Sequence, residues 1–379
     1  MDNYKICKRC VMDTTCDPNL ELDSSGICNY CHKFDEEWKK NQCEVEKESL
    51  DNIFAKIKAD GKGRQYDCVI GLSGGVDSSY VAYLAKQNGL RVLAVHVDAG
   101  WNSELAVQNI ENICEKLGYD LHTVVIDWPT MKELQRAYLF SGLANLDVPQ
   151  DHCFVAAVWH MARKFKVKYI LSGYNLSTEG ILSNAYQYSF KDWKNIKAVY
   201  KKCGRNRISL KKYPHMSFGE RYFLMPYVYR TTNISPLNYI HYEKKEAIKL
   251  LEKEFGWKYY GGKHYESRFT KFFQEVYLPQ KWGWEKRRDH IASLIVGGEM
   301  TREEGMAELS IPSSTDEEKR DELEYVLKKL DISAEEWENI LELPRKKGTD
   351  YKNEQRMVGI LKKVKKVLEK LVVSNGQYF

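Results

Sequence analysis

Between residues 66 and 180, short apolar runs alternate with segments whose apolar residues recur every three or four positions. The runs predict buried strands at 67–72, 91–98, 121–126 and 168–172, and the segments between them predict helices. Strands that alternate with helices form a parallel sheet covered on both faces. The pattern therefore predicts a doubly wound α/β core, which we place at residues 61–180.

The pattern changes on both sides of this core. Residues 1–60 hold paired cysteines followed by a polar, helical connector, and residues 181–262 are rich in Tyr, Lys and Arg and predict an insertion over the site or a partner surface. Residues 263–379 predict a helical C-terminal region. Its last helix, near 355–371, carries an apolar stripe that is typical of core or interface. The stripe consists of Met357, Ile360, Leu361, Val364, Leu368 and Leu371.

Charge and export signals narrow the class of protein. The net charge is only +5, but residues 191–221 carry a net +8, residues 344–371 a net +7 and residues 314–343 a net −7. Such segregation of charge is consistent with binding to nucleic acid, with binding of an anionic small substrate, or with solvated faces that meet one another. No signal peptide opens the chain and no apolar run could span a bilayer, so we expect a cytoplasmic protein without a membrane partner.

Residues 73–79 read Ser-Gly-Gly-Val-Asp-Ser-Ser and join the first predicted strand to the first predicted helix. Gly74 and Gly75 let the backbone approach a ligand closely, and the helix start offers unpaired N–H groups and the positive end of its dipole. Three hydroxyls and one carboxylate surround this point, from Ser73, Asp77, Ser78 and Ser79. The stretch predicts a phosphate-binding loop, against the alternative of an ordinary glycine-rich turn.

Polar residues also end the second and fourth predicted strands. His96 and Asp98 end the second, and Ser172, Gly173 and Asn175 follow the fourth. Ligands of such sheets bind beyond the carboxyl ends of the strands, at the point where the strand order reverses. We therefore expect these residues and the 73–79 loop to share one crevice; taken singly, each pair would fit an exposed strand end equally well.

The paired cysteines have the spacing C-x2-C-x17-C-x2-C, at Cys7, Cys10, Cys28 and Cys31. Two such knuckles with four thiolates form a closed tetrahedral site, so we expect structural Zn²⁺. Reduced structural cysteines are the alternative. Cys16 lies between the knuckles. A second alternative is that Cys16 replaces one of the four ligands.

Residues 260–274 alternate aromatic and cationic side chains. On a helix, His264, Arg268 and Lys271 would share one face, which could meet phosphate or carboxylate, and the phenylalanines would share another. A plain amphipathic helix with a solvated basic side is the alternative.

The 73–79 loop resembles the pyrophosphate loop of the ATP pyrophosphatases (the PP-loop superfamily), which cleave ATP between its α and β phosphates. Together with the cysteine knuckles, the Ser172-Gly173-Tyr174-Asn175 element and the 260–274 segment, the chain resembles the N-acetyl sugar amidotransferases of lipopolysaccharide and flagellar sugar biosynthesis. The resemblance implies an adenine nucleotide α-hydrolase-like fold. It also implies an acetamido sugar activated by ATP as its adenylate and then converted by ammonia to the acetamidino sugar.

The resemblance implies roles for individual residues. The glycines and serines of the loop would bind pyrophosphate, and Asp77 would order the loop or Mg²⁺. His96, Asp98, Ser172, Gly173 and Asn175 would contact the nucleotide. Asp98 and Asp151 are candidates for metal or acceptor contacts, and Lys263, Arg268 and Lys271 for charge neutralisation. The resemblance also implies that ammonia comes from a separate glutaminase with a cyclase-like subunit. The chain itself shows no glutaminase signature.

Two other functions stay open. A tRNA-modifying thiolase would share the loop and the knuckles, although thiolases use a cysteine pair and Cys153 stands alone near the expected site; we therefore expect no nucleic-acid partner. A non-catalytic zinc and nucleotide module is the other alternative. The identity of the sugar and the oligomeric state lie beyond the sequence.

Overall fold

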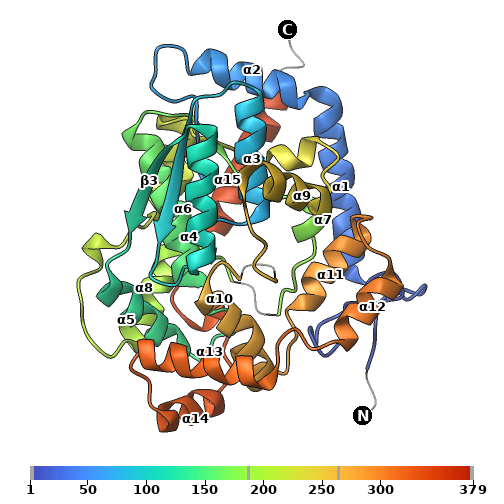
Figure 1. Ribbon diagram of the computed structural model, residues 1–379, viewed down its shortest axis with the longest axis vertical. Coiled ribbons are helices and arrows are strands. Elements are labelled where there is room, and N and C mark those ends of the chain that lie inside the picture. The colour runs from blue at the N-terminus through green and yellow to red at the C-terminus, as the bar shows by residue number, and fades with distance from the viewer. Residues whose placement is uncertain (1–3, 186–187, 263–264, 376–379) are drawn as a thin grey trace.

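The computed structural model describes residues 4–185, 188–262 and 265–375, and a five-stranded parallel sheet forms its centre (Figure 1). The strand order is β3-β2-β1-β4-β5. The strands are β1 (Cys68–Gly71), β2 (Val92–Asp98), β3 (Asp120–Val125), β4 (Tyr169–Leu171) and β5 (Thr232–Ile234). The first four confirm the predicted strands, whereas β5 pairs with β4 from within the 181–262 segment, where the pattern predicted none.

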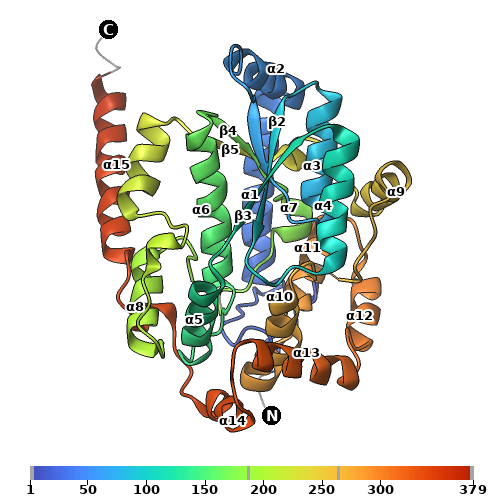
Figure 2. The ribbon, with the colours of Figure 1, turned by 60° about the vertical axis from the view of Figure 1, so that its left-hand side comes forward.

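Helices cover both faces of the sheet, because alternate residues of its buried strands point to opposite sides. Cys68 and Ile70 of β1 pack in one apolar cluster with α2, α3, α4 and α9, while Val69 packs in another with α5, α6 and α8. Figure 2 shows the sheet between these two layers. The predicted doubly wound fold is confirmed. The covering helices are α2 (Leu50–Asp60), α3 (Val76–Gln87), α4 (Glu104–Leu117), α5 (Trp128–Leu139), α6 (Val148–Lys164), α8 (Trp193–Cys203) and α9 (Lys244–Phe255).

The strand order fixes where a ligand can enter. From β1 the chain steps outward to β2 and β3, and then returns across the sheet to β4 on the other side of β1. The connections after β1 and β4 therefore leave in opposite directions. The gap between them is the switch point at which α/β sheets bind ligands.

The remaining elements lie outside the sheet layers. The cysteine segment leads into α1 (Asn29–Lys47), and the C-terminal region is helical as predicted, with capping boxes at Thr301 and Ser333. No helix within the described ranges combines the length and the apolar character needed to cross a membrane. The other elements are α7 (Leu176–Glu179), η1 (Leu210–Lys212), η2 (Glu220–Val228), η3 (Pro236–Tyr239), α10 (Arg268–Phe272), η4 (Phe273–Trp282), α11 (Arg287–Val296), α12 (Arg302–Ser310), α13 (Asp316–Lys329), α14 (Ala334–Glu342), η5 (Gly348–Asp350) and α15 (Gln355–Asn375).

One helix starts later than the pattern suggested. The hydroxyl of Ser267 accepts from the backbone N–H of Thr270 and caps α10, so the helix begins at Arg268. Residues 265–267 are not helical, and His264 lies outside the described residues. The interpretation of His264, Arg268 and Lys271 as one helical face required a helix through 265–267, which the structure does not form, since the cap at Ser267 starts the helix at Arg268.

A buried histidine joins α6 to the 181–262 segment. His152 is fully buried and stacks on Trp193 and Tyr213. Its Nδ1 lies 2.7 Å from the carbonyl oxygen of Phe190, and its Nε2 lies 3.2 Å from the backbone nitrogen of Met216. Nε2 accepts that N–H only when the ring is neutral, and burial lowers the pKa of His152 to about 4.

Acid should therefore destabilise this protein through His152. Below its usual pKa of about 6.5, the unfolded chain takes up a proton that the folded chain refuses, so stability falls as the pH drops from about 6.5 toward 4, by about 3 kcal/mol for this one group. Urea unfolding at pH 7 and pH 4.5 measures the effect. His152→Gln should lose less stability between these two pH values than the wild type.

A second histidine contributes to that measurement. Burial also lowers the pKa of His160, which leaves part of the dependence on pH in the His152→Gln variant. A His152→Gln protein as sensitive to acid as the wild type would contradict this assignment.

Candidate active site and cysteine cluster

The 73–79 loop turns tightly between β1 and α3. Gly74 has φ +83°, and a Cβ on it would lie 2.5 Å from the carbonyl oxygen of Ala106. The backbone N–H of Gly75 donates to Ser73 Oγ at 3.2 Å, and Ser78 Oγ donates to the carbonyl of Gly75 at 3.2 Å. Only glycine fits at position 74, so the packing against α4 fixes the path of the loop.

The connection after β4 lies directly against this loop. A Cβ on Gly173 would lie 2.8 Å from the backbone nitrogen of Ser78, so the two chain segments meet at the start of α3. The hydroxyl of Ser172 accepts from the backbone N–H of Tyr174 at 3.2 Å. Asn175 is buried, and its Oδ1 caps α7 by accepting from the N–H of Thr178 at 2.9 Å. Asn175 thus holds the turn that brings Gly173 to the loop.

A cavity of about 210 Å³ opens above the loop. It is smaller than the roughly 300–1,000 Å³ of typical small-molecule pockets, so it suits part of a ligand, such as a pyrophosphate group. Its walls come from the loop, from both neighbouring strand ends and from residues beyond 240. They are Gly71, Ser73, Gly75, Val76, Asp77, Ser78, Gly173, Glu179, Lys244, Tyr260 and Glu266. A larger open groove of about 700 Å³ lies between α3 and α9 and includes no residue of the loop.

Three aromatic residues from beyond position 240 contact the loop; we call them the loop-contacting aromatics, Tyr242, Trp257 and Tyr260. The Tyr242 hydroxyl donates to Asp77 Oδ1, and Trp257 Nε1–H donates to the carbonyl of Gly74 at 2.9 Å. The Tyr260 hydroxyl lies 3.0 Å from where a Cβ on Gly75 would sit. Burial and the charge of Asp77 raise the pKa of Tyr242, so its phenol keeps the proton that it donates.

Sequence reasoning missed Tyr242 and Trp257 as loop contacts. Tyr242 precedes a helix without any motif around it, and Trp257 follows one. The available signal was composition alone, since aromatic residues gather at 257–260 next to two glycines.

His96 and Asp98, the predicted end of β2, form a small network with Asn102. Asn102 Nδ2 lies 3.0 Å from His96 Nε2 and 3.1 Å from Asp98 Oδ1. Since Asn102 donates to Nε2, the other ring nitrogen carries the proton and donates to the carbonyl of Leu72 at 3.1 Å. His96 therefore contacts the residue that precedes the loop. Neither it nor Asp98 is among the residues that line the 210 Å³ cavity.

The 260–274 segment reaches the cavity through backbone pairing. The N–H of Ser103 donates to the carbonyl of Glu266 at 2.9 Å, and the N–H of Arg268 donates to that of Trp101 at 2.9 Å. This pairing carries Glu266 to the cavity wall, where its carboxylate also bonds the Tyr260 hydroxyl. The segment that the sequence singled out thus meets the loop, through Tyr260 and Glu266.

The cationic candidates lie differently. Arg268 pairs with Glu322 at 3.0 and 3.1 Å and lies over the Tyr325 ring, 3.4 Å from its centroid. Lys271 lies over the ring of Tyr265 at 5.3 Å. Lys263 falls outside the described residues. The contacts of Arg268 with Glu322 and Tyr325 therefore connect α10 to α13.

Asp151 and Ser79 complete the predicted set. Asp151 lies in the first turn of α6, the end of that helix nearest the carboxyl ends of the strands. In the same turn, Gln150 Oε1 lies 3.4 Å from Ser267 Oγ. Ser79 is buried in α3, and its hydroxyl has no partner among the described residues. Ser79 is not among the residues that line the 210 Å³ cavity, unlike Ser73 and Ser78.

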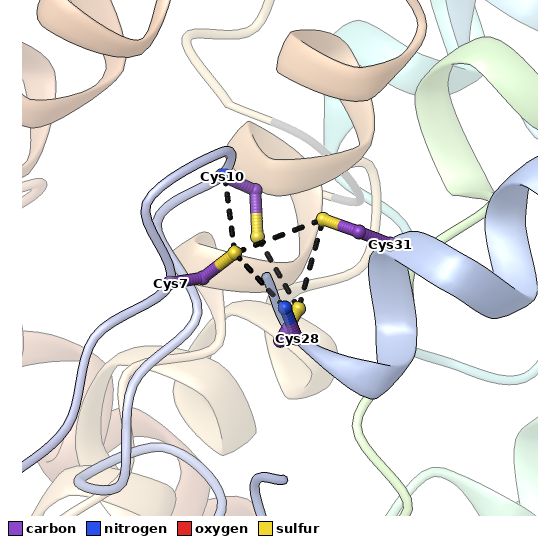
Figure 3. A group of neighbouring side chains, drawn as sticks. All are labelled: Cys7, Cys10, Cys28 and Cys31. Carbon is purple, nitrogen blue, oxygen red and sulfur yellow. Dashed lines mark hydrogen bonds between the residues drawn. The ribbon is translucent and has the colours of Figure 1, made fainter. Parts of the chain in front are cut away.

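Four thiols come together as predicted, at Cys7, Cys10, Cys28 and Cys31 (Figure 3). Three of the sulfur–sulfur separations are 3.9, 3.7 and 3.6 Å. A tetrahedral ion with Zn–S bonds of about 2.3 Å holds its sulfurs roughly 3.8 Å apart. The donor set therefore fits one Zn²⁺ without an open position. Cys16 lies outside the cluster, and its thiol donates to the carbonyl of Asp13 at 3.1 Å.

The cysteine cluster packs on the C-terminal region. Arg302 of α12 donates to the carbonyls of Cys10 at 3.1 Å and Cys7 at 3.2 Å, and Arg288 of α11 donates to that of Val11 at 2.8 Å. The same apolar cluster includes Leu176 of α7. Since α7 follows the Gly173 turn, the cysteine cluster supports one wall of the crevice.

Two known families match parts of this chain. Residues 46–142 match NAD synthase, and residues 266–367 match the family described as LPS biosynthesis protein WbpG-like, C-terminal domain. The first match spans the 73–79 loop, and the second begins at Glu266 in the cavity wall. Together they confirm the resemblance to an N-acetyl sugar amidotransferase within the PP-loop superfamily.

Curated relatives match about a quarter of the chain. The tRNA(Ile)-lysidine synthase of Chlamydia pneumoniae is 33% identical over 109 residues, which are 26% of this chain and 33% of that protein. The tRNA-specific 2-thiouridylase MnmA 2 of Fusobacterium nucleatum subsp. nucleatum is 28% identical over 118 residues, 29% of this chain and 34% of that protein. The chain spans about a third of the length of these relatives.

Solved structures give weaker likenesses. The NH3-dependent NAD synthetase from Campylobacter jejuni is 17% identical with a TM-score of 0.29, over 44% of this chain and 72% of that one. The U34-tRNA thiolase NcsA from Methanococcus maripaludis, with its 4Fe-4S cluster, is 17% identical with a TM-score of 0.33, over 79% of this chain and 88% of that one. At these TM-scores neither likeness bears on function.

Proposed function

We propose that this chain, in which a PP-loop domain precedes a WbpG-like C-terminal domain, is an ATP-dependent amidotransferase. It adenylates the acetamido oxygen of an N-acetylated sugar, nucleotide-linked or free, and replaces that oxygen with ammonia for bacterial surface glycan synthesis. The observation that carries the proposal is the shared cavity: Glu266, the first residue of the WbpG-like match, faces the 73–79 loop. The WbpG-like part of the chain thus borders the loop that would bind phosphate.

The loop would hold the leaving pyrophosphate. The N–H groups of Gly74 and Gly75, the hydroxyls of Ser73, Ser78 and Ser79 and the positive end of α3 would supply donors to its oxygens. The Gly75 N–H and the Ser78 hydroxyl would exchange the bonds that they make within the loop for bonds to the ligand. Three carboxylates, from Asp77, Glu179 and Glu266, line the same cavity. Oxygen donors of this kind suit Mg²⁺, which would neutralise charge on the phosphates when bound.

The remaining candidates would act around this centre. His96, Asp98, Ser172, Gly173 and Asn175 would shape the nucleotide side of the crevice, by holding the loop and the turn after β4. Asp98 and Asp151 would contact metal or acceptor, and Lys263, Arg268 and Lys271 would neutralise phosphate or an anionic group on the sugar. For Arg268 this role requires it to share its guanidinium with Glu322.

The reaction balances in two steps. The amide oxygen attacks the α-phosphorus of ATP, and the bond to the β-phosphate oxygen breaks with its electron pair leaving on pyrophosphate. Ammonia then attacks the imidate carbon, loses protons to a nearby base, and the carbon–oxygen bond breaks to release AMP. An amide oxygen is a weak nucleophile, so positioning and charge stabilisation must supply most of the rate. A separate glutaminase with a cyclase-like subunit would supply the ammonia.

A panel of substrates tests this proposal. The protein is incubated with ATP, Mg²⁺, ammonium and acetamido sugars, free and linked to UDP or CMP, and mass spectrometry follows AMP and the replacement of oxygen by NH. We expect AMP and an amidine product from one class of sugar. AMP formation with tRNA and with none of the sugars would overturn the proposal.

A tRNA-modifying enzyme is the second candidate, because the curated relatives include a thiouridylase and a lysidine synthase. One observation weighs against sulfur transfer. Cys153 is fully buried, its thiol donates to the carbonyl of Gln150 at 3.2 Å, and burial raises the pKa of the thiol. A nucleophilic cysteine needs exposure and a lowered pKa. Loss of tRNA-dependent activity in Cys153→Ala would favour this candidate instead.

A further inference from the structure

The last helix, α15, stands at the edge of the molecule (Figure 2). Its base is firmly held, because the N–H of Glu354 donates to Asp192 Oδ2 at 2.7 Å and the Tyr351 hydroxyl donates to the carbonyl of Ser141 at 2.7 Å. Beyond this base the helix is mostly exposed through residue 367. Because its start is anchored and the rest of the helix is exposed, α15 is accessible to another molecule.

One stripe of the exposed part of α15 is apolar. Met357, Ile360, Val364 and Val367 are 40%, 54%, 49% and 56% exposed. They recur at intervals of three and four residues, which is the spacing of the seam between two paired helices. In the sequence Leu371 continues the series. The half-buried Leu361 lies to one side of this seam, toward the body of the protein.

The other side of the seam is basic. Arg356 and Lys363 are exposed and lie seven residues apart, each directly before a residue of the seam. In paired helices, side chains at such flanking positions form salt bridges with the partner helix. Lys370 continues this row in the sequence. The whole helix carries six bases and one acid. Two copies of α15 would bring these like charges together, which disfavours pairing with a second copy.

From the apolar seam and its basic border we propose that α15 binds an amphipathic helix of another protein, one that carries Glu or Asp beside its own apolar seam. Apolar side chains of the two helices interdigitate, and the acids pair with Arg356 and Lys363. The lysines elsewhere on α15 raise the rate of encounter with such an acidic partner. This inference uses no residue of the 73–79 loop or of the cavity, so it stands or fails apart from the proposed reaction.

Two synthetic peptides of the length of α15 test it. Both carry Ile and Leu along the seam; one has Glu at the flanking positions and the other has Lys. Fluorescence anisotropy with the full chain should show binding of the acidic peptide, weakened by salt, and none of the basic one. The double variant Ile360→Asp and Val364→Asp should weaken binding by about tenfold or more.

Charge reversal and a matched control sharpen the result. Arg356→Glu with Lys363→Glu should transfer preference from the acidic to the basic peptide. Val125→Asp changes an equally apolar side chain, 72% exposed on β3, and should leave binding unchanged. All variants should keep the circular dichroism spectrum and the melting temperature of the wild type, which shows that they fold.

Three outcomes would overturn the proposal. Equal binding of both peptides, or of neither, removes the charge selectivity on which it depends. Light scattering that shows a dimer lost in the Ile360→Asp and Val364→Asp variant assigns the seam to a second copy. Flotation of the chain with phosphatidylglycerol vesicles, lost in the same variant, assigns it to an anionic membrane surface.

Discussion

Replacing Asp77 with alanine should slow the formation of AMP and pyrophosphate by about 10²–10³-fold. The Asp77 carboxylate lines the 210 Å³ cavity at the first turn of α3 and accepts from the Tyr242 hydroxyl. Its removal takes away both a candidate Mg²⁺ ligand and one of the contacts between the loop and the chain beyond 240. Steady-state assays of AMP and pyrophosphate, with the sugar that reacts in the panel, measure the loss.

Two further variants separate charge from positioning. Asp77→Asn keeps an acceptor for Tyr242 but removes the charge, so it should lose nearly as much rate as Asp77→Ala. Tyr242→Phe removes one hydrogen bond and should cost about tenfold or less, in line with about 1 kcal/mol. A folded Asp77→Ala protein that works at the wild-type rate would defeat the assignment of the loop as the activation site.

Replacing Cys28 with serine should remove the metal and lower the melting temperature by about 10 °C. All four thiols are fully buried, and the backbone around them accepts hydrogen bonds from Arg302 and Arg288. Loss of a structural metal is among the changes that cost about 4–5 kcal/mol or more, and each kcal/mol shifts the melting temperature by about 2–4 °C in large domains. Metal analysis and thermal unfolding give the two numbers.

Cys16 supplies the matched control. It is as buried as the four ligands, but its thiol bonds the carbonyl of Asp13, so Cys16→Ser should keep one metal per chain. Activity should fall in Cys28→Ser as well, because Leu176 of α7 packs on the cysteine cluster and follows the turn at Gly173. Full metal content in Cys28→Ser would contradict the four-thiolate site.

The core of the fold follows from local patterns in the sequence. The strands at 67–72 and 91–98 contain the uninterrupted apolar runs 68–70 and 92–95, because both faces of the sheet are covered there. Such runs can be recognised in the sequence without knowledge of the fold. The strand β5 was missed because it has only three residues, none of them buried, within a basic segment. It becomes a strand through pairing with β4, which no local pattern shows.

The candidate site likewise has parts that the sequence predicts and parts that only the fold shows. The 73–79 loop and the cysteine knuckles are local motifs, so their residues could be predicted with their chemistry. The loop-contacting aromatics could not, because Tyr242 lies 165 residues and Trp257 lies 183 residues from their partners in the loop. Arg268 has the residue type and spacing of a phosphate ligand, and only the fold shows that Glu322 already occupies its guanidinium.

These long separations also set the order in which the chain can acquire its parts as it is translated. The sheet strands β1 to β4 and the 73–79 loop leave the ribosome well before Tyr242, Trp257 and Tyr260, and the cysteine cluster waits for Arg302, 295 residues after Cys7. A nascent chain that ends before residue 240 therefore has the 73–79 loop without the contacts from Tyr242, Trp257 and Tyr260. The loop can reach its full set of contacts only after most of the sheet domain has been translated.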